Sequence, residues 1–138
     1  MANNKQQAAY LFVKTWTGRG HERSESQTFW NQLLHDVFGI TIPANFIQYE
    51  LPVHLKTQKF IDAYIPSTKV LIEQKSSTED LLKVSRQSDQ AQLTPFEQAQ
   101  RYAMGLEYSK RPRWIVTCNF KSFFVYDMEH PQDKPFKI

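Results

Sequence analysis

Three charged residues fall where a pair of strands would normally carry apolar side chains. Asp62 lies within Lys59–Ile65, and Glu73 and Lys75 lie within Thr68–Lys75. Both segments are rich in strand-forming residues, and the Pro-Ser-Thr sequence that joins them is typical of a tight turn. The pattern therefore predicts a β-hairpin with three charges near its open end.

The length of the hairpin loop decides whether Asp62 and Glu73 meet. Side chains alternate between the faces of a strand, so a two-residue loop sets the two acids diagonally and a four-residue loop sets them directly opposite. In both cases the carboxylates would share a face, roughly 5–8 Å apart, whereas an odd loop would separate them. Lys75 would follow about 7 Å further along the same face as Glu73.

Two close carboxylates repel each other unless a cation lies between them, and hard divalent cations prefer oxygen ligands. Mg²⁺ typically takes one or two carboxylates and keeps several waters. Asp62, Glu73 and the backbone carbonyl of Gln74 would supply such a site. Lys75 would then orient or help deprotonate an attacking water, or neutralise developing charge. This set is suited to the hydrolysis of a phosphodiester.

The alternative is that Glu73 and Lys75, two residues apart, form part of an ordinary solvated strand face. Their setting favours a site. Val70–Ile72 precede Glu73 without a polar residue, which predicts a strand buried on both faces. Charges at the end of such a strand are costly unless something binds them.

Composition indicates one globular domain without disulfides. The chain has 138 residues, of which 41% are hydrophobic and 14% aromatic, and only four glycines. The net charge of +3 and the pI of about 9.0 are compatible with a polyanionic partner but indicate one only weakly. Cys118 is the single cysteine and is expected to be a buried thiol. The polar N-terminus and the lack of a run of ~20 apolar residues suggest a cytoplasmic protein.

The first half of the chain is expected to form two helices after a frayed start. Tyr10–Trp16 predicts a short helix, and Glu22–Phe38 predicts an amphipathic helix that ends at Gly39. On a helical wheel Glu22 lies closer to the buried stripe than Glu25, so Glu22 is the acid expected to point inward. Both acids would also favour the positive end of the helix dipole.

The middle of the chain is expected to contain one strand and one further helix beside the hairpin. Phe46–Leu51 predicts a strand, and Pro52–Gln58 predicts a polar loop before the hairpin. A helix from Thr78 to about Arg86 is expected after the hairpin, because Ser76–Asp80 could cap it and the segment carries Leu81, Leu82 and Val84.

A second helix has a strong start signal at Thr94, where Pro95 takes the first helical position and Glu97 completes a capping box. The helix is expected to run to about Leu106. Gln98 and Tyr102 lie four residues apart and therefore share a face. The pair would need hydrogen-bond partners if that face meets a sheet, although a surface glutamine beside a core tyrosine would give the same pattern.

The last third of the chain predicts two strands, Trp114–Asn119 and Phe123–Asp127, with Phe136–Ile138 resembling the start of another. The resulting order is helices, three strands, two helices and two strands. This order predicts an α/β sandwich with a central mixed sheet of about five strands flanked by helices. We expect residues 1–138 to form a single domain, the first of a longer protein.

The chain resembles the PD-(D/E)XK nuclease superfamily, in which a helix precedes a hairpin that carries Asp…(Asp/Glu)-x-Lys. The motif reads Asp62…Glu73-Gln74-Lys75 here, and the spacing of Gln98 and Tyr102 resembles the Q-x-x-x-Y element of one nuclease branch. Four stretches are similar to the N-terminal domain of MmeI-like bifunctional restriction–modification enzymes: ERSESQTFWNQLL, FIDAYIPSTKVLIEQKSS, LTPFEQAQRYA and RPRWIVTCNF. The similarity spans about Glu22 to Asp127.

The resemblance implies a restriction-endonuclease-like core and a role for each motif residue. Asp62 and Glu73 would bind Mg²⁺, with Mn²⁺ as a substitute, and Lys75 would be the catalytic lysine. Either Glu22 or, less expected, Glu25 would match an acidic helix residue that some members use. The implied accessory or DNA-contacting residues are Gln98, Tyr102, Ser76 and Arg101.

In the MmeI-like family the nuclease precedes a helical spacer, an adenine methyltransferase and a target-recognition domain. The chain departs from the superfamily pattern at Ile61, where proline commonly precedes the aspartate. It carries no methyltransferase motif, so any use of S-adenosylmethionine would belong to domains beyond Ile138.

The leading hypothesis is a Mg²⁺-dependent DNA endonuclease domain with double-stranded DNA as its partner. One metal site cuts one strand, so a double-strand break would need two copies in a transient or DNA-bound dimer. Two alternatives stay open, namely a catalytically silent DNA-binding or assembly module of the same fold, and a repair or recombination nuclease. The candidate contacts to the DNA backbone are Lys69, Lys83, Arg86, Arg101, Arg111 and Arg113.

Overall fold

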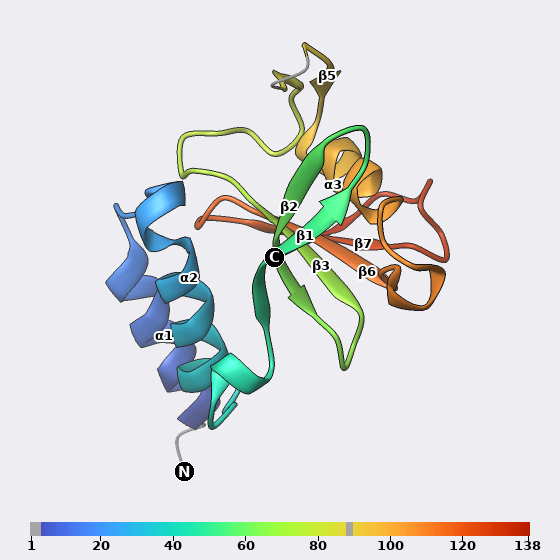
Figure 1. The fold of residues 1–138 in the computed structure, drawn as a ribbon. Helices are drawn as coiled ribbons and strands as arrows, with labels where there is room; N and C mark the ends of the chain where they lie inside the picture. Colours follow the sequence, from blue (N-terminus) through green and yellow to red (C-terminus); the bar gives the residue numbers. More distant parts are fainter. Residues whose placement is uncertain (1–3, 88–89) are drawn as a thin grey trace.

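The structure, a computed structural model, describes residues 4–87 and 90–138 and is built around a six-stranded mixed sheet (Figure 1). The strands lie in the order β1-β2-β3-β6-β7-β8. Only β3 and β6 pair in parallel, and the other neighbours are antiparallel. The strands span β1 Gln48–His54, β2 Gln58–Ile65, β3 Val70–Gln74, β6 Trp114–Cys118, β7 Phe123–Asp127 and β8 Phe136–Lys137.

The α/β class predicted from the sequence is confirmed, but the strand count is wrong by one. The segment that resembled the start of a strand does pair, as β8, with β7, which gives six strands rather than five. A separate two-stranded ribbon, β4 Ser85–Arg86 with β5 Gln92–Leu93, precedes the third helix.

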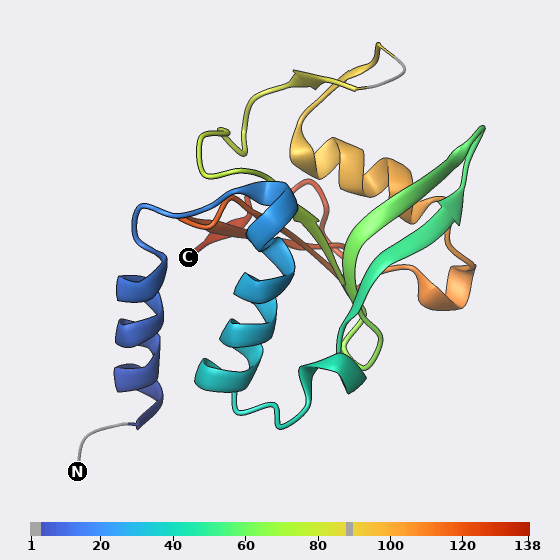
Figure 2. The same ribbon diagram turned by 60° about the vertical axis from the view of Figure 1, so that its left-hand side comes forward.

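Helices cover both faces of the sheet (Figures 1 and 2). The first two helices pack on one face, and the third, which lies in the connection between the parallel strands β3 and β6, packs on the other. The helices span α1 Asn4–Trp16, α2 Glu22–Gln32 with a π-helical continuation Leu33–Val37, and α3 Pro95–Ala103. Two short 3₁₀ turns complete the elements, Pro43–Asn45 and Tyr108–Lys110.

Each face of the sheet has its own hydrophobic core. On the side of α1 and α2 the core is largely aromatic, with Phe29 fully buried between Phe12 and Trp16 at centroid distances of 5.0 and 5.1 Å. On the side of α3 the core joins helix residues such as Ala99 to Leu71 and Ile115 of the two central strands. The central strands are therefore buried on both faces, as expected for β3 from its apolar sequence.

The helix expected over Glu22–Phe38 is present, with its last turn in π-helical form, and it ends at Gly39, whose φ is +75°. The first helix begins at Asn4, so the expected frayed start before Tyr10 is wrong for residues 4–9. Residues 1–3 lie outside the described residues.

Two expectations in the middle of the chain are also wrong. No helix forms between Thr78 and Arg86, because the Asp80 side chain accepts a 2.9 Å hydrogen bond from the Leu82 N–H and so favours a turn. Strand β1 continues through Pro52 to His54, where a loop was expected. Since β1 is the edge strand of the sheet, Pro52 can be included without losing an inner-strand hydrogen bond.

Candidate active site

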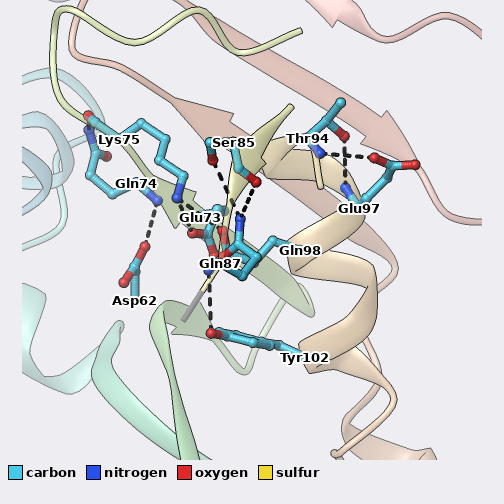
Figure 3. Close-up of polar contacts among 10 residues, drawn as sticks. All are labelled: Asp62, Glu73, Gln74, Lys75, Ser85, Gln87, Thr94, Glu97, Gln98 and Tyr102. Carbon is cyan, nitrogen blue, oxygen red and sulfur yellow. Dashed lines mark hydrogen bonds and ion pairs between the residues drawn. The ribbon is translucent and has the colours of Figure 1, made fainter. Parts of the chain in front are cut away.

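The open end of the β2–β3 hairpin holds the two acids that the sequence singles out. Ile65 pairs with Val70, so the loop has four residues, and the ladder stops at Ala63 opposite Ile72. One step beyond, where the two strands diverge, Asp62 and Glu73 occupy opposite register positions. The Asp62 carboxylate accepts a 2.7 Å hydrogen bond from the backbone N–H of Gln74 (Figure 3).

Lys75 is held between the hairpin and α3. Its Nζ lies 3.3 Å from Oε2 of Glu73 and donates a 3.0 Å hydrogen bond to Oε1 of Gln98. Gln98 in turn donates to the hydroxyl of Tyr102 at 3.3 Å, so the two helix residues form one chain of contacts with the lysine (Figure 3). The ammonium group and Gln98 are both buried, which fixes the geometry of the chain.

The start of α3 explains why Gln98 and Tyr102 face the sheet. Thr94 accepts a hydrogen bond from the Glu97 N–H at 3.1 Å, and the Glu97 side chain accepts one from the Thr94 N–H at 2.9 Å. This capping box is the predicted one, with Pro95 at the first helical position. It sets the point at which the helix begins and therefore the direction in which residues four apart project.

The side chain and the backbone of Gln74 have different partners. Its fully buried side chain accepts a 2.7 Å hydrogen bond from Nε1 of Trp30 and donates a 3.0 Å bond to the carbonyl of Lys75. The N–H and C=O of one strand residue point to the same neighbouring strand, so the Gln74 carbonyl lies on the β2 side with its N–H. The carbonyl is thus on the side of the strand where Asp62 lies.

Glu22 joins the site from the first turn of α2, whereas Glu25 does not. A pocket of about 260 Å³ opens between α2 and the β1–β2 pair, and its lining residues are Glu22, Arg23, Ser26, Gln27, Glu50, Asp62 and Gln74. Glu25 instead binds Arg19 at 2.9 Å and accepts the backbone N–H of His21 at 3.0 Å. Glu25 therefore secures the turn before the helix, which is the structural role that the helix dipole favours.

Burial is the main influence on the ionisation of the carboxyl groups at the site. Burial raises the pKa of Asp62 to about 6, against the opposing hydrogen bond from Gln74. Burial, together with the charge of Asp62, also raises the pKa of Glu73 well above its usual value. Burial lowers the pKa of Lys75, but the charges of Glu73 and Glu22 outweigh burial and leave that pKa raised.

These groups offer hard oxygen donors of the kind that Mg²⁺ selects. Within the residues described, no three or more His, Cys, Asp or Glu side chains already surround a common point. A cation would therefore use Asp62, Glu73 and the Gln74 carbonyl together with several waters, which is a normal ligand set for Mg²⁺.

Comparison with known proteins decides the family. A family model described as "MmeI, N-terminal domain" matches residues 3–136, nearly the whole chain. The chain belongs to the MmeI N-terminal domain family. This membership associates it with MmeI-like restriction enzymes. No curated protein and no solved structure matched the chain in the same comparisons.

The other candidate DNA-contacting residues of this MmeI-type domain lie outside the pocket. Ser76 is half-buried in the loop after β3, where its hydroxyl lies 3.0 Å from that of Thr78, and Arg101 is half-buried on α3. Neither residue lines the pocket. Arg111 donates a 3.4 Å hydrogen bond to the Leu106 carbonyl. Arg113 forms ion pairs with Asp127 at the end of β7 and with Glu129 in the turn that follows.

The remaining basic residues that were candidates for DNA contacts are exposed. Lys69, in the β2–β3 turn, has a left-handed backbone with φ of 55°. Lys83 and Arg86 are exposed beside the short ribbon, and neither lines the pocket. None of the helices in the described part of this MmeI-type domain is long and apolar enough to cross a membrane.

Two charged pocket residues were not anticipated from the sequence. Glu50 lies on β1 at the register position opposite Asp62, with a left-handed φ of 53°. Arg23 is adjacent to Glu22 and lines the same pocket. The sequence of the strand, FIQYEL, could not show that Glu50 lies near Asp62, because this proximity depends on the register of β1 with β2. Arg23 could not be singled out, because a cation next to Glu22 in a helix is also typical of a solvated surface.

Proposed function

We propose that the MmeI-type domain is a PD-(D/E)XK nuclease that hydrolyses DNA phosphodiester bonds with Mg²⁺. One observation carries the proposal: Asp62 and Glu73 flank the point where β2 and β3 diverge, with Lys75 held against Glu73. The same three residue types in the same order define the motif that the sequence resembles. Of the three residues, Asp62 lines the acidic pocket, whereas Glu73 and Lys75 are buried and do not line it.

Asp62, Glu73 and the Gln74 carbonyl would hold the Mg²⁺ ion, and Mn²⁺ would substitute for it. The ion would supply Lewis acidity towards a phosphoryl oxygen and make a bound water more acidic. The burial of the two carboxyl groups supports this assignment, since a divalent cation would offset the cost of their negative charge.

The reaction consumes one water for each ester bond cut. The water oxygen forms a bond to phosphorus, one ester P–O bond breaks, and the leaving oxygen takes a proton to become an alcohol. Lys75 does not line the pocket, so as an ammonium group held between Glu73 and Gln98 it would stabilise the negative charge that grows on the phosphoryl oxygens through its electric field. Glu22, on the α2 wall of the pocket, accepts a hydrogen bond from the attacking water.

The family membership extends the proposal to the whole protein. The domain would act on double-stranded DNA in the cytoplasm within a bifunctional restriction–modification enzyme, where S-adenosylmethionine serves a methyltransferase in other domains. Two copies would be needed for a double-strand break, which implies a transient or DNA-bound dimer.

A plasmid-nicking assay tests the proposed chemistry. The 138-residue chain should convert supercoiled DNA to open circles with Mg²⁺ and stop when the metal is chelated. Lys75→Ala should slow nicking by about 100-fold or more, because the charge-stabilising group is lost. Lys14→Ala, which removes an exposed cation from α1, serves as the matched control and should nick at the wild-type rate. Equal nicking by wild type and Lys75→Ala would refute the assignment.

One observation favours a second candidate, a module of the same family that binds DNA without cutting it. Glu73 is only 3% exposed and does not line the pocket that Asp62 lines. If this alternative holds, calorimetry should detect no Mg²⁺ or Mn²⁺ binding while the chain still binds DNA. Detectable Mn²⁺ binding that Asp62→Asn abolishes would exclude it.

A further inference from the structure

The pocket beside Asp62 has a cation on its wall that the proposed chemistry has not used. Among the described residues that line the pocket, Arg23 is the only cation, and it stands with the acids Glu22, Glu50 and Asp62. Lys75 is not part of that lining, since its ammonium group points to Glu73 and Gln98. Arg23 is therefore the positive group that a ligand entering the pocket would meet.

Helix stability does not explain why an arginine lies at this position. Arg23 is the second residue of α2, where the helix dipole favours acids and disfavours cations by about 0.3–1 kcal/mol. Its side chain is exposed, and across residues 4–87 and 90–138 it forms no salt bridge. Residues that break a local rule without a structural return are often functional.

The backbone that carries Arg23 is fixed relative to the sheet. At the start of α2, the Gly20 carbonyl accepts a 3.0 Å hydrogen bond from the Ser77 N–H, just past the end of β3. Further along α2, the Tyr49 hydroxyl on β1 donates a 2.7 Å bond to Asn31. The helix is thus attached to the strands on both sides of the pocket, so the backbone of Arg23 has a defined position beside it.

An anionic phosphodiester approaching this pocket would meet three carboxylates, and a cation is needed to offset their repulsion. A guanidinium binds two phosphoryl oxygens at once with parallel N–H groups, which a point charge cannot do. We propose that Arg23 binds the nonbridging oxygens of the DNA phosphate that occupies the pocket. The proposal rests on the proposed nuclease function for the identity of the ligand.

Arg23→Ala and Arg23→Lys test the proposal, with Lys14→Ala as the charge-matched control from an exposed site on α1. Two readouts are needed. The first is the maximal single-turnover rate of Mg²⁺-dependent cleavage. The second is the dependence of DNA affinity on salt with the metal chelated, measured by fluorescence polarisation with a short duplex.

Arg23→Ala should lower the maximal rate about 100-fold, since it removes a donor to the reacting phosphate, and Arg23→Lys should recover only part of it. Arg23→Ala should also lower the slope of log affinity against log salt by about one, the value for a single phosphate contact. Lys14→Ala should leave both quantities at the wild-type values.

The two readouts separate failure of this proposal from failure of the nuclease assignment. If wild type cleaves and Arg23→Ala retains both the rate within twofold and the salt slope, the role of Arg23 is refuted and the nuclease stands. If wild type does not cleave, the nuclease assignment fails, and the salt slope alone decides. A lower slope in Arg23→Ala then supports a phosphate contact, whereas an unchanged slope refutes it.

Discussion

Buried polar side chains near the site form two separate hydrogen-bonded groups, one on each face of the sheet. Lys75 and Gln98 meet on the α3 face, and Trp30 and Gln74 meet on the α2 face. Gln74, the last residue of β3, and Lys75, which follows it, supply one member of each group, because neighbouring side chains point to opposite faces. The backbone of Gln74 is thereby fixed from its side chain, while the same backbone presents an N–H to Asp62.

Replacing Trp30 by phenylalanine tests how strongly that backbone is fixed. The Gln74 oxygen would lose its 2.7 Å partner in a fully buried position, which costs about 1–3 kcal/mol in addition to the loss of ring volume. Trp16→Phe is the matched control, because Trp16 is equally buried but its 3.1 Å partner, Gln32, is only partly buried. Urea unfolding should show Trp30→Phe to be the less stable variant, and equal stabilities would contradict this role.

At the scale of residues, the sequence was informative where the relevant spacing was local. Gln98 and Tyr102 belong to one helix turn, so periodicity predicted their contact. Asp62 and Glu73 belong to one hairpin and were expected on one face only for an even loop, and the loop has four residues. The contact of Trp30 with Gln74 joins residues 44 apart, and Glu50 reaches Asp62 only through the pairing of β1. No local pattern could predict either contact, since both depend on how elements pack.

At the scale of elements, the turn between α1 and α2 places the helix that carries Glu22 and Arg23. Gly20 adopts φ of +137° and approaches the start of the loop after β3 so closely that an added Cβ would lie 2.6 Å from Cβ of Ser77 and 2.9 Å from Cδ2 of Phe120. The absence of a side chain therefore allows the end of β3 and the beginning of α2 to touch. This contact brings Glu22 near Lys75.

Gly20→Ala should consequently destabilise the fold more than Gly18→Ala. Both glycines have left-handed backbones, with strain of about 1–3 kcal/mol for alanine, but a Cβ on Gly18 meets no atom within 4 Å. Steric overlap should add about 1–3 kcal/mol for Gly20→Ala only. Thermal or urea unfolding of the two variants measures the difference, and indistinguishable values would show that the close approach carries no energy.

The elements themselves were predictable where both pattern and boundary signals agreed. The capping box fixed the start of α3, and Gly39 marked the end of the helix that follows α2. The helix expected after β3 does not form. Asp80 favours a turn, and of the apolar residues in this segment only Leu81 is buried. Strand β1 was cut short at Pro52 because its edge position could not be known in advance.

At the scale of the whole molecule, the sheet brings together residues from four elements at one place. β2 and β3 supply the acids and the lysine, α3 supplies its partner, and α2 forms the opposite wall of the pocket. Two hydrophobic cores, one on each face, hold these elements in register. The site therefore depends on the complete α/β architecture rather than on the hairpin alone.

The most direct test of the account is to locate Mn²⁺ by its anomalous scattering in crystals of the 138-residue chain. We expect one ion within about 2.0–2.6 Å of a carboxylate oxygen of Asp62, a carboxylate oxygen of Glu73 and the Gln74 carbonyl, completed by waters. An ion bound elsewhere, or no ion while the Asp62 carboxylate keeps its hydrogen bond to Gln74, would contradict the proposed metal site.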